Sequence, residues 1–146
     1  MQTIDVEIKA KTIARITFPF KELRKPSIKV ILRPHISKNV FDVVKRSQKE
    51  TCFISPFITY SPMKSVLDHV KDHILVRVIA GTKSAYAAVI NASKDSGKKV
   101  LVKYRGQVHS KVLTSDNECL ISSFNITQAG LEKQAEVGIL TNDLNI

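Results

Sequence analysis

Alternation of apolar and polar residues over residues 3–9 opens the chain and is typical of a β-strand. Three segments carry this pattern or a high content of β-branched residues: residues 3–9, 12–18 and 28–33. Beyond them, Ser37 is a candidate N-cap for a helix over about residues 38–50. The chain is therefore predicted to begin with a β-rich extension over residues 1–35.

From residue 51 onward, short apolar runs alternate with segments of helical periodicity. The predicted order is strand, helix, strand, helix, strand, over residues 51–57, 63–72, 74–81, 82–97 and 98–104. Thr82 can cap the second of these helices and Gly97 can end it. Strands joined by helices form right-handed crossovers, which predicts a parallel sheet with helices on its faces.

In the last third of the chain the pattern is different: three apolar segments follow one another with short connections. They are residues 108–114, 118–125 and 135–141, and all three are expected to be strands. A three-residue loop in the first hairpin would place Asn125 opposite His109 and Ser123 opposite Lys111. The fold class predicted for residues 1–146 is a single α/β domain with a mixed, largely parallel central sheet flanked by helices.

Composition narrows the class of protein. The 146 residues are 43% hydrophobic and 25% charged, which is ordinary for a globular protein. No apolar run approaches the roughly 18 residues of a membrane span, so no integral membrane association is expected. The N-terminal residues lack the pattern of a secretory signal. Cys52 and Cys119 lie far apart in apolar surroundings and are interpreted as buried free thiols, which predicts a cytoplasmic location.

The charge of the chain is strongly positive and unevenly distributed. There are 23 Lys plus Arg against 13 Asp plus Glu, a formal net charge of +10. The net charge is +7 over residues 1–50, +4 over residues 51–100 and −1 over the remainder. Such a balance favours a polyanionic partner, either nucleic acid or an anionic lipid surface. The alternative interpretation is a solvated, solubilising surface.

The candidate chemistry is concentrated between residues 107 and 138. His109 and Lys111 are two residues apart, so in a strand they project from the same face. Asn125 and Glu136 follow on the next two predicted strands. An imidazole, an ammonium, an amide and a carboxylate on one side of a sheet suit nucleophilic displacement at phosphorus, because the imidazole can form a covalent intermediate. The ammonium and the amide can stabilise the phosphoryl oxygens.

In this region the sequence resembles the phospholipase D superfamily. His109, Lys111 and Asp116 match the motif His-x-Lys-x₄-Asp. A Gly-Ser-x-Asn type segment is matched by Ser122-Ser123-Phe124-Asn125, with Ser122 standing where the family commonly has Gly. Glu136 before Gly138 matches the later glutamate. The resemblance covers about residues 36–142, which form the expected catalytic core, and says little about the extension.

The resemblance implies a phosphodiesterase that forms a phosphohistidine and needs neither a metal nor another cofactor. Family members build one active site from two motif copies, and this chain carries one, which implies a homodimer. His109 would be the nucleophile of one protomer and the acid, then base, of the other. Lys111 and Asn125 would hold the phosphoryl oxygens, and Glu136 would orient an imidazole. Asp116 is expected to be a structural member of the motif.

The leading hypothesis is an endonuclease that cleaves DNA or RNA. Basic segments over residues 21–33 and 94–105 could flank a substrate groove, and Ser123, Lys103 and Arg105 are the candidate substrate-binding residues. Arg105 has an alternative interpretation as a residue of exposed loop surface. Four aromatic residues could stack on bases, although two of them, Phe18 and Phe57, are interpreted as core. The four are Phe18, Phe20, Phe57 and Tyr60.

Two other functions fit parts of the pattern. The second enzyme hypothesis is hydrolysis of a phospholipid or cardiolipin-type phosphodiester. Faster turnover of liposomes than of nucleic acid would favour it. A non-catalytic nucleic-acid-binding module is the third, and the intact set of four polar groups argues against it. Salt-sensitive binding without cleavage would support this third hypothesis.

Overall fold

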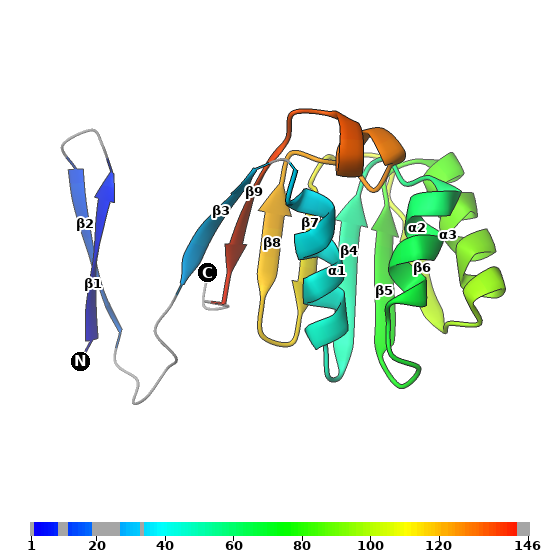
Figure 1. Cartoon of the computed structure of the whole chain (residues 1–146), viewed down its shortest axis with the longest axis horizontal. Coiled ribbons are helices and arrows are strands. Elements are labelled where there is room, and N and C mark those ends of the chain that lie inside the picture. The colour runs from blue at the N-terminus through cyan, green and yellow to red at the C-terminus, as the bar shows by residue number, and fades with distance from the viewer. Residues whose placement is uncertain (1, 9–11, 19–26, 33, 143–146) are drawn as a thin grey trace.

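The computed structural model describes residues 2–8, 12–18, 27–32 and 34–142, and side chains from residue 27 onward. β1 (Gln2–Ile8) and β2 (Thr12–Phe18) pair antiparallel and form a two-stranded sheet of their own (Figure 1). Both strands were predicted, the first from the alternation of residue types and the second from its content of β-branched residues. Phe20 and most of the basic segment predicted over residues 21–33 lie outside the described residues.

A seven-stranded sheet in the order β3-β9-β8-β7-β4-β5-β6 forms the rest of the framework. Its strands are β3 (Ile28–Leu32), β4 (Glu50–Ser55), β5 (Leu75–Ala80), β6 (Val100–Tyr104), β7 (Val112–Ser115), β8 (Cys119–Ser122) and β9 (Val137–Thr141). The pairings of β4 with β5 and of β5 with β6 are parallel, and the other four are antiparallel. Five strands therefore run in one direction, and β7 and β9 run in the other. The mixed α/β sheet is confirmed.

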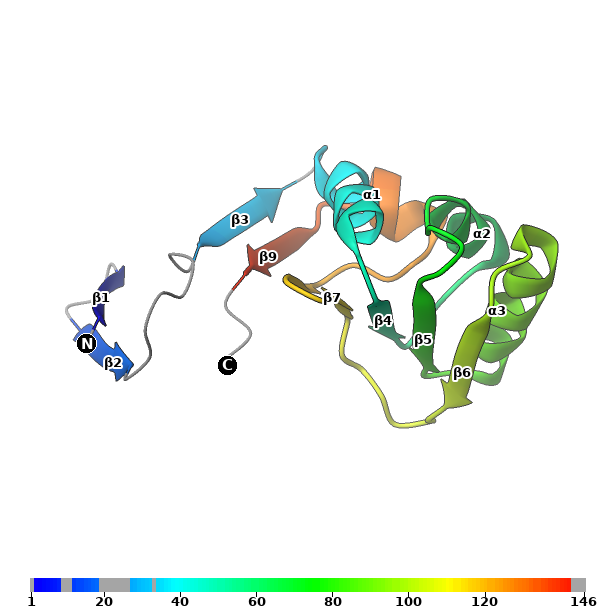
Figure 2. The same cartoon turned by 90° about the horizontal axis from the view of Figure 1, so that it is seen from below.

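Three helices cover one face of this sheet: α1 (Ile36–Arg46), α2 (Tyr60–Asp68) and α3 (Lys83–Ser96) (Figure 2). The main core lies between them and the sheet, where Phe53, Met63, Leu67 and Leu120 are fully buried. A sheet flanked by helices was expected. The opposite face instead carries large exposed side chains, because no helix among the described residues lies over it.

Local capping chemistry explains which helix boundaries were predictable. Thr82 accepts a hydrogen bond of 3.1 Å from the Ala85 N–H, and Gly97 ends α3 with φ +66°, so both predictions are confirmed. The prediction that Ser37 caps α1 is wrong. The N-cap is His35, Ser37 lies in the first turn, and α1 ends at Arg46 rather than near residue 50.

The register of the β7–β8 hairpin differs from the predicted one by one residue. Thr114 pairs with Cys119, and the Ser115 N–H donates to the Glu118 carbonyl at 2.9 Å. These contacts leave a two-residue loop over 116–117 where three residues were expected. Because pairing stops at the ends of the short strands, Asn125 does not lie opposite His109 in a ladder. That prediction is wrong.

The structure also describes the two cysteines and the lengths of the helices. Cys52 and Cys119 are free thiols as expected, although each is half-buried rather than buried. Across the described part of the chain, the helices are too short or too polar to span a bilayer.

Candidate functional site

The strand directions bring the predicted chemical groups to one edge of the seven-stranded sheet, the edge formed by the carboxyl end of β4 and the neighbouring strand ends. Because β7, β8 and β9 alternate in direction, the start of β7, the end of β8 and the start of β9 lie beside the carboxyl end of β4. His109 and Lys111 precede β7, Asn125 follows β8, and Glu136 directly precedes β9. The groups therefore sit on loops at the edge and not on the strand face that was predicted. Such an edge is the usual position of ligand sites in α/β sheets.

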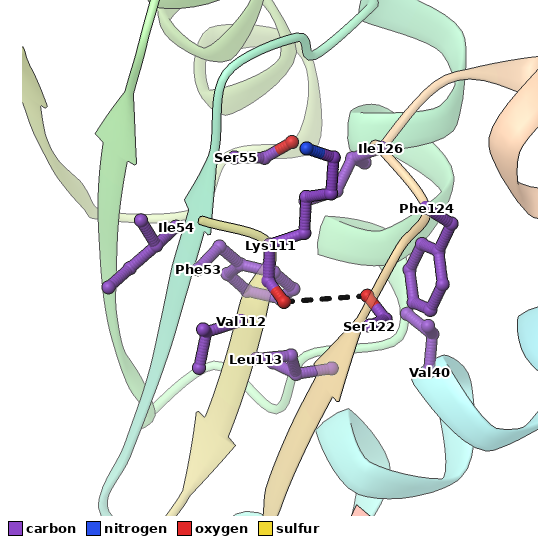
Figure 3. Close-up of a pocket in the computed structure, with 10 residues that line it drawn as sticks. All are labelled: Val40, Phe53, Ile54, Ser55, Lys111, Val112, Leu113, Ser122, Phe124 and Ile126. Atoms are coloured by element: carbon purple, nitrogen blue, oxygen red, sulfur yellow. Dashed lines mark hydrogen bonds between the residues drawn. The ribbon is translucent and has the colours of Figure 1, made fainter. Parts of the chain in front are cut away.

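Lys111 and His109 contact each other directly. The Lys111 ammonium donates a hydrogen bond of 2.9 Å to the His109 carbonyl, and Nζ lies 3.4 Å from His109 Nδ1. Figure 3 shows Lys111 reaching from the start of β7 toward the Ser55 hydroxyl at the end of β4. The Ser122 hydroxyl donates to the Lys111 carbonyl at 3.4 Å. A half-buried cation thus lies beside an exposed imidazole.

Asn125 is fixed from two sides. The Ser55 hydroxyl lies 3.5 Å from Asn125 Oδ1 and donates to the Phe57 carbonyl at 2.9 Å. On the other side, a Cβ added to Gly130 would lie 2.4 Å from the Asn125 carbonyl oxygen, so only glycine permits this backbone approach. The side-chain amide of Asn125 is therefore presented from a well-supported segment. Ser55 was not singled out from the sequence, because a serine in a buried strand gives no signal of its partner.

Glu136 and Ser123 form a second polar pair at the same edge. The Ser123 hydroxyl donates to the Glu136 carboxylate and in turn lies 3.1 Å from the Val137 N–H, which donates to it. The pair ties the end of β8 to the start of β9. Sequence reasoning assigned Ser123 to substrate and Glu136 to an imidazole, and both assignments stay predictions.

Asp116 lies at the other end of the β7–β8 hairpin, away from this edge. Its carboxylate accepts hydrogen bonds of 2.6 to 3.2 Å from the backbone N–H groups of Gln48, Lys49 and Glu50. Partial burial tends to raise the pKa of Asp116, but these backbone donors outweigh it and hold the pKa below its usual value. The carboxylate joins the loop before β4 to the hairpin turn.

Lys103 and Arg105 lie at the carboxyl end of β6, on the same edge of the sheet as His109. Both side chains are exposed. The Arg105 N–H donates to the Ala80 carbonyl at 2.9 Å, which fixes the backbone where the loop toward His109 begins. Within the described part of the chain, no three His, Cys, Asp or Glu side chains form a group that could hold a metal ion.

Comparison with known proteins relates this architecture to a family fold. No family model and no curated protein sequence matches the chain. Nuc from Salmonella typhimurium, a phospholipase D family member, matches with a TM-score of 0.65 and 21% identity, over 82% of this chain and 84% of Nuc. NucT from Helicobacter pylori matches with a TM-score of 0.65 and 14% identity, over 82% and 87%.

A third solved structure is similar over a larger share of this chain. Phosphatidylserine synthase from Haemophilus influenzae matches with a TM-score of 0.62 and 14% identity, over 94% of this chain and 39% of the synthase. The chain therefore has the phospholipase D fold, as the motif resemblance predicted.

Proposed function

We propose that this protein is a metal-independent phosphodiesterase, and that its substrate is the backbone of DNA or RNA, cleaved internally. One observation carries the proposal: the fold brings His109, Lys111, Asn125 and Glu136 from three separate loops to one edge of the sheet. A nucleophile, a fixed cation, an amide donor and a carboxylate are the groups that phosphoryl transfer through a covalent intermediate uses.

The proposed reaction has two displacements. An imidazole nitrogen of His109 attacks phosphorus, the P–O bond to the leaving group breaks, and His109 of the second protomer gives its proton to the leaving oxygen. That second imidazole then takes a proton from water, whose oxygen attacks phosphorus and releases His109. Lys111 and Asn125 stabilise the charge on the phosphoryl oxygens in both steps. Glu136 orients an imidazole.

A nucleic-acid substrate is supported by charge. The formal net charge of +10 favours a polyanion, and Lys103 and Arg105 are exposed at the edge that carries His109. Ser123 lies at the same edge, and its hydroxyl would donate to a phosphate oxygen in place of the Glu136 carboxylate. A backbone of repeated phosphates can engage the site and the flanking cations together, which a single small phosphodiester does not.

A homodimer is supported by the uncovered face of the sheet. Val30, Ile139 and Ile121 lie side by side on β3, β9 and β8 and are each about half exposed or more. Monomeric proteins rarely leave such a contiguous apolar patch in water. Val137 extends the patch to the residue next to Glu136, so a second copy bound there would also reach the site.

A phospholipid substrate is the second candidate, favoured by the structural similarity to a phosphatidylserine synthase. The two candidates share the reacting groups and differ in what surrounds the phosphate. Hydrolysis of phosphatidylglycerol or cardiolipin vesicles faster than of any oligonucleotide, at equal enzyme concentration, would replace the nuclease by the lipid enzyme.

The test is cleavage of end-labelled single- and double-stranded DNA and RNA in excess EDTA, with His109→Ala as the matched variant. We expect internal cleavage by the wild-type protein to persist in EDTA and to fall by at least about 1,000-fold in the variant, because the nucleophile is removed. Cleavage that EDTA abolishes, or that survives in His109→Ala, would contradict the proposal.

A further inference from the structure

An exposed aromatic pair lies beside the candidate site without a role in the chemistry described above. Phe57 is 51% exposed and Tyr60 39% exposed, so the interpretation of Phe57 as a core residue is wrong. The two rings border a hollow of about 270 Å³ between residues 57–60 and the start of α3. Leaving a phenyl ring in water is unfavourable, and a flat apolar ligand in the hollow would cover it.

The segment that carries Phe57 is tied to Asn125. The Ser55 hydroxyl connects the Phe57 carbonyl to Asn125, as described above. Two residues later, the Thr59 N–H donates to the Ile126 carbonyl at 3.0 Å. A ligand in the hollow would therefore contact a segment that is hydrogen-bonded to the loop carrying Asn125.

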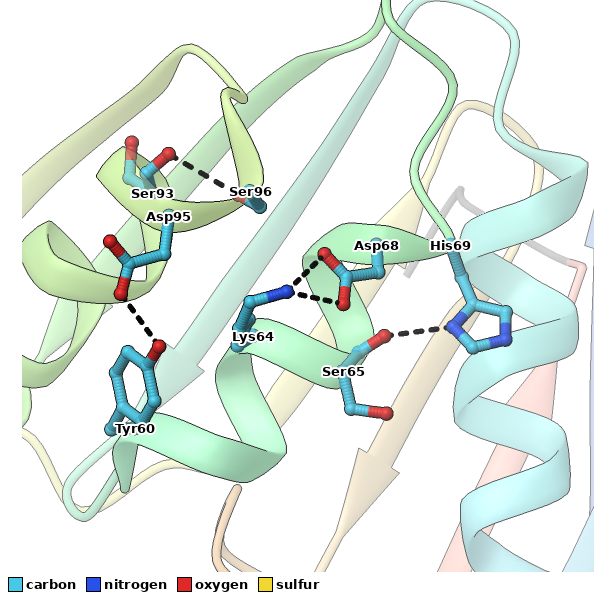
Figure 4. A network of polar contacts seen from close by, with 8 residues as sticks. All are labelled: Tyr60, Lys64, Ser65, Asp68, His69, Ser93, Asp95 and Ser96. Atoms are coloured by element: carbon cyan, nitrogen blue, oxygen red, sulfur yellow. Dashed lines mark hydrogen bonds and ion pairs between the residues drawn. The ribbon is translucent and has the colours of Figure 1, made fainter.

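The backbone that leads to Phe57 and the ring of Tyr60 are both held in place. A Cβ added to Gly81 would lie 2.6 Å from Pro56 Cα and 2.8 Å from the Val108 carbonyl oxygen, so the segments before Phe57 and before His109 touch the same glycine. The Tyr60 hydroxyl donates to Asp95 on α3 at 2.6 Å, which anchors the second ring (Figure 4). A preorganised platform loses little entropy when a ligand stacks on it.

We propose that the hollow between Phe57 and Tyr60 binds a nucleobase of the nucleotide beside the cleaved phosphodiester. This inference rests on the proposed function and adds a subsite to it. A base fits the chemistry, since its π-face can stack on the exposed phenyl ring while its polar edge meets the hydroxyls of Thr59 and Ser84, which line the same hollow. Stacking tolerates every base, so the subsite should require a base without selecting a sequence.

The experiment compares Phe57→Ala with wild type on two labelled single-stranded oligonucleotides of equal length. One is ordinary DNA, and the other carries tetrahydrofuran abasic sugars in place of the bases. We expect wild type to show a KM about 10-fold or more lower for ordinary DNA, and Phe57→Ala to lose that preference without a change on the abasic strand. Phe57→Trp should retain the preference. Tyr86→Ala, an exposed aromatic on the other side of α3 from Ser84, is the matched control and should leave it intact.

Binding of the same oligonucleotides to the His109→Ala protein is measured alongside by fluorescence anisotropy, with and without Phe57→Ala. This arm tests the hollow even if no nucleic acid is cleaved, so failure of the proposed function and of the subsite are distinguishable. Equal affinity of the two oligonucleotides for the His109→Ala protein, or a base preference that survives Phe57→Ala, would overturn the inference. So would tighter binding of phosphatidylglycerol vesicles than of either oligonucleotide with the same dependence on Phe57.

Discussion

Asp116 stabilises the junction between two segments that are distant in the sequence. Its carboxylate accepts from the three successive backbone N–H groups of residues 48–50. Removing the acceptor leaves these donors without their charged partner. We therefore expect Asp116→Ala to lower the free energy of unfolding at pH 7 by about 1–2 kcal/mol, a figure reduced for partial exposure. Urea denaturation followed by circular dichroism measures the change.

The same carboxylate predicts a dependence on pH. Its pKa is lower in the folded state, so its contribution is complete above the unfolded value of about 4 and is lost as pH falls through the folded value. The difference in stability between wild type and Asp116→Ala should therefore shrink on acidification below about pH 4. Asn117→Ala, in the same turn, is the control and should show no such trend. A difference that stays constant down to pH 2 would contradict this account.

A single helical turn positions the amide of the candidate site. The π-helical turn η1 (Ala129–Lys133) places Gly130 against the backbone of Asn125. A methyl group there must displace backbone atoms, and a displacement of about 1 Å at a reacting group can cost about 100-fold in rate. We expect Gly130→Ala to lower kcat by about 10- to 100-fold, as measured with the best oligonucleotide substrate.

That experiment must distinguish a general loss of stability from a displacement of Asn125. Gly97→Ala is the matched control, because its φ of +66° makes alanine unfavourable by about 1 kcal/mol while no atom lies within 4 Å of the added Cβ. Gly97→Ala should lower the thermal midpoint and leave kcat unchanged. Equal losses of kcat in the two variants would show that Gly130 acts on stability alone.

Elements with local signals were predictable, and their mutual register was not. Thr82 and Gly97 mark α3 because capping depends on a few adjacent residues. The hairpin register depends on a two-residue loop over 116–117, and the sequence leaves two or three residues equally open. For the candidate site, motif spacing named the reacting groups. The partner of Asn125 could not be named, because Ser55 lies 70 residues earlier and meets it only in the folded sheet.

At the scale of the whole molecule, the sheet face that no described helix covers leaves apolar side chains exposed to water. Its exposed apolar residues on β3, β9 and β8 are Ile28, Val30, Leu32, Ile121, Val137 and Ile139. The strand register aligns them across three neighbouring strands, so they form one patch rather than scattered exposed residues. A second copy of the chain is the occupant that also completes a site proposed to need two imidazoles.

Introducing a charge in the middle of this patch should separate the protomers. Val30 and Ile139 are cross-strand neighbours, 60% and 44% exposed, so either can become aspartate without creating a buried charge in the isolated chain. In a dimer packed through this face the carboxylate would be desolvated. We expect Val30→Asp or Ile139→Asp to weaken self-association by at least about 10-fold in sedimentation equilibrium.

Activity should follow the loss of dimer if the two imidazoles come from different protomers. The specific activity of Val30→Asp should then fall at low protein concentration and recover as concentration rises, while its thermal unfolding stays close to that of wild type. Leu101→Asp, with similar exposure on the far edge strand β6, is the control and should leave both association and activity unchanged. A fully active monomer of Val30→Asp would overturn the shared site, whereas an unchanged dimer would move the interface to another surface.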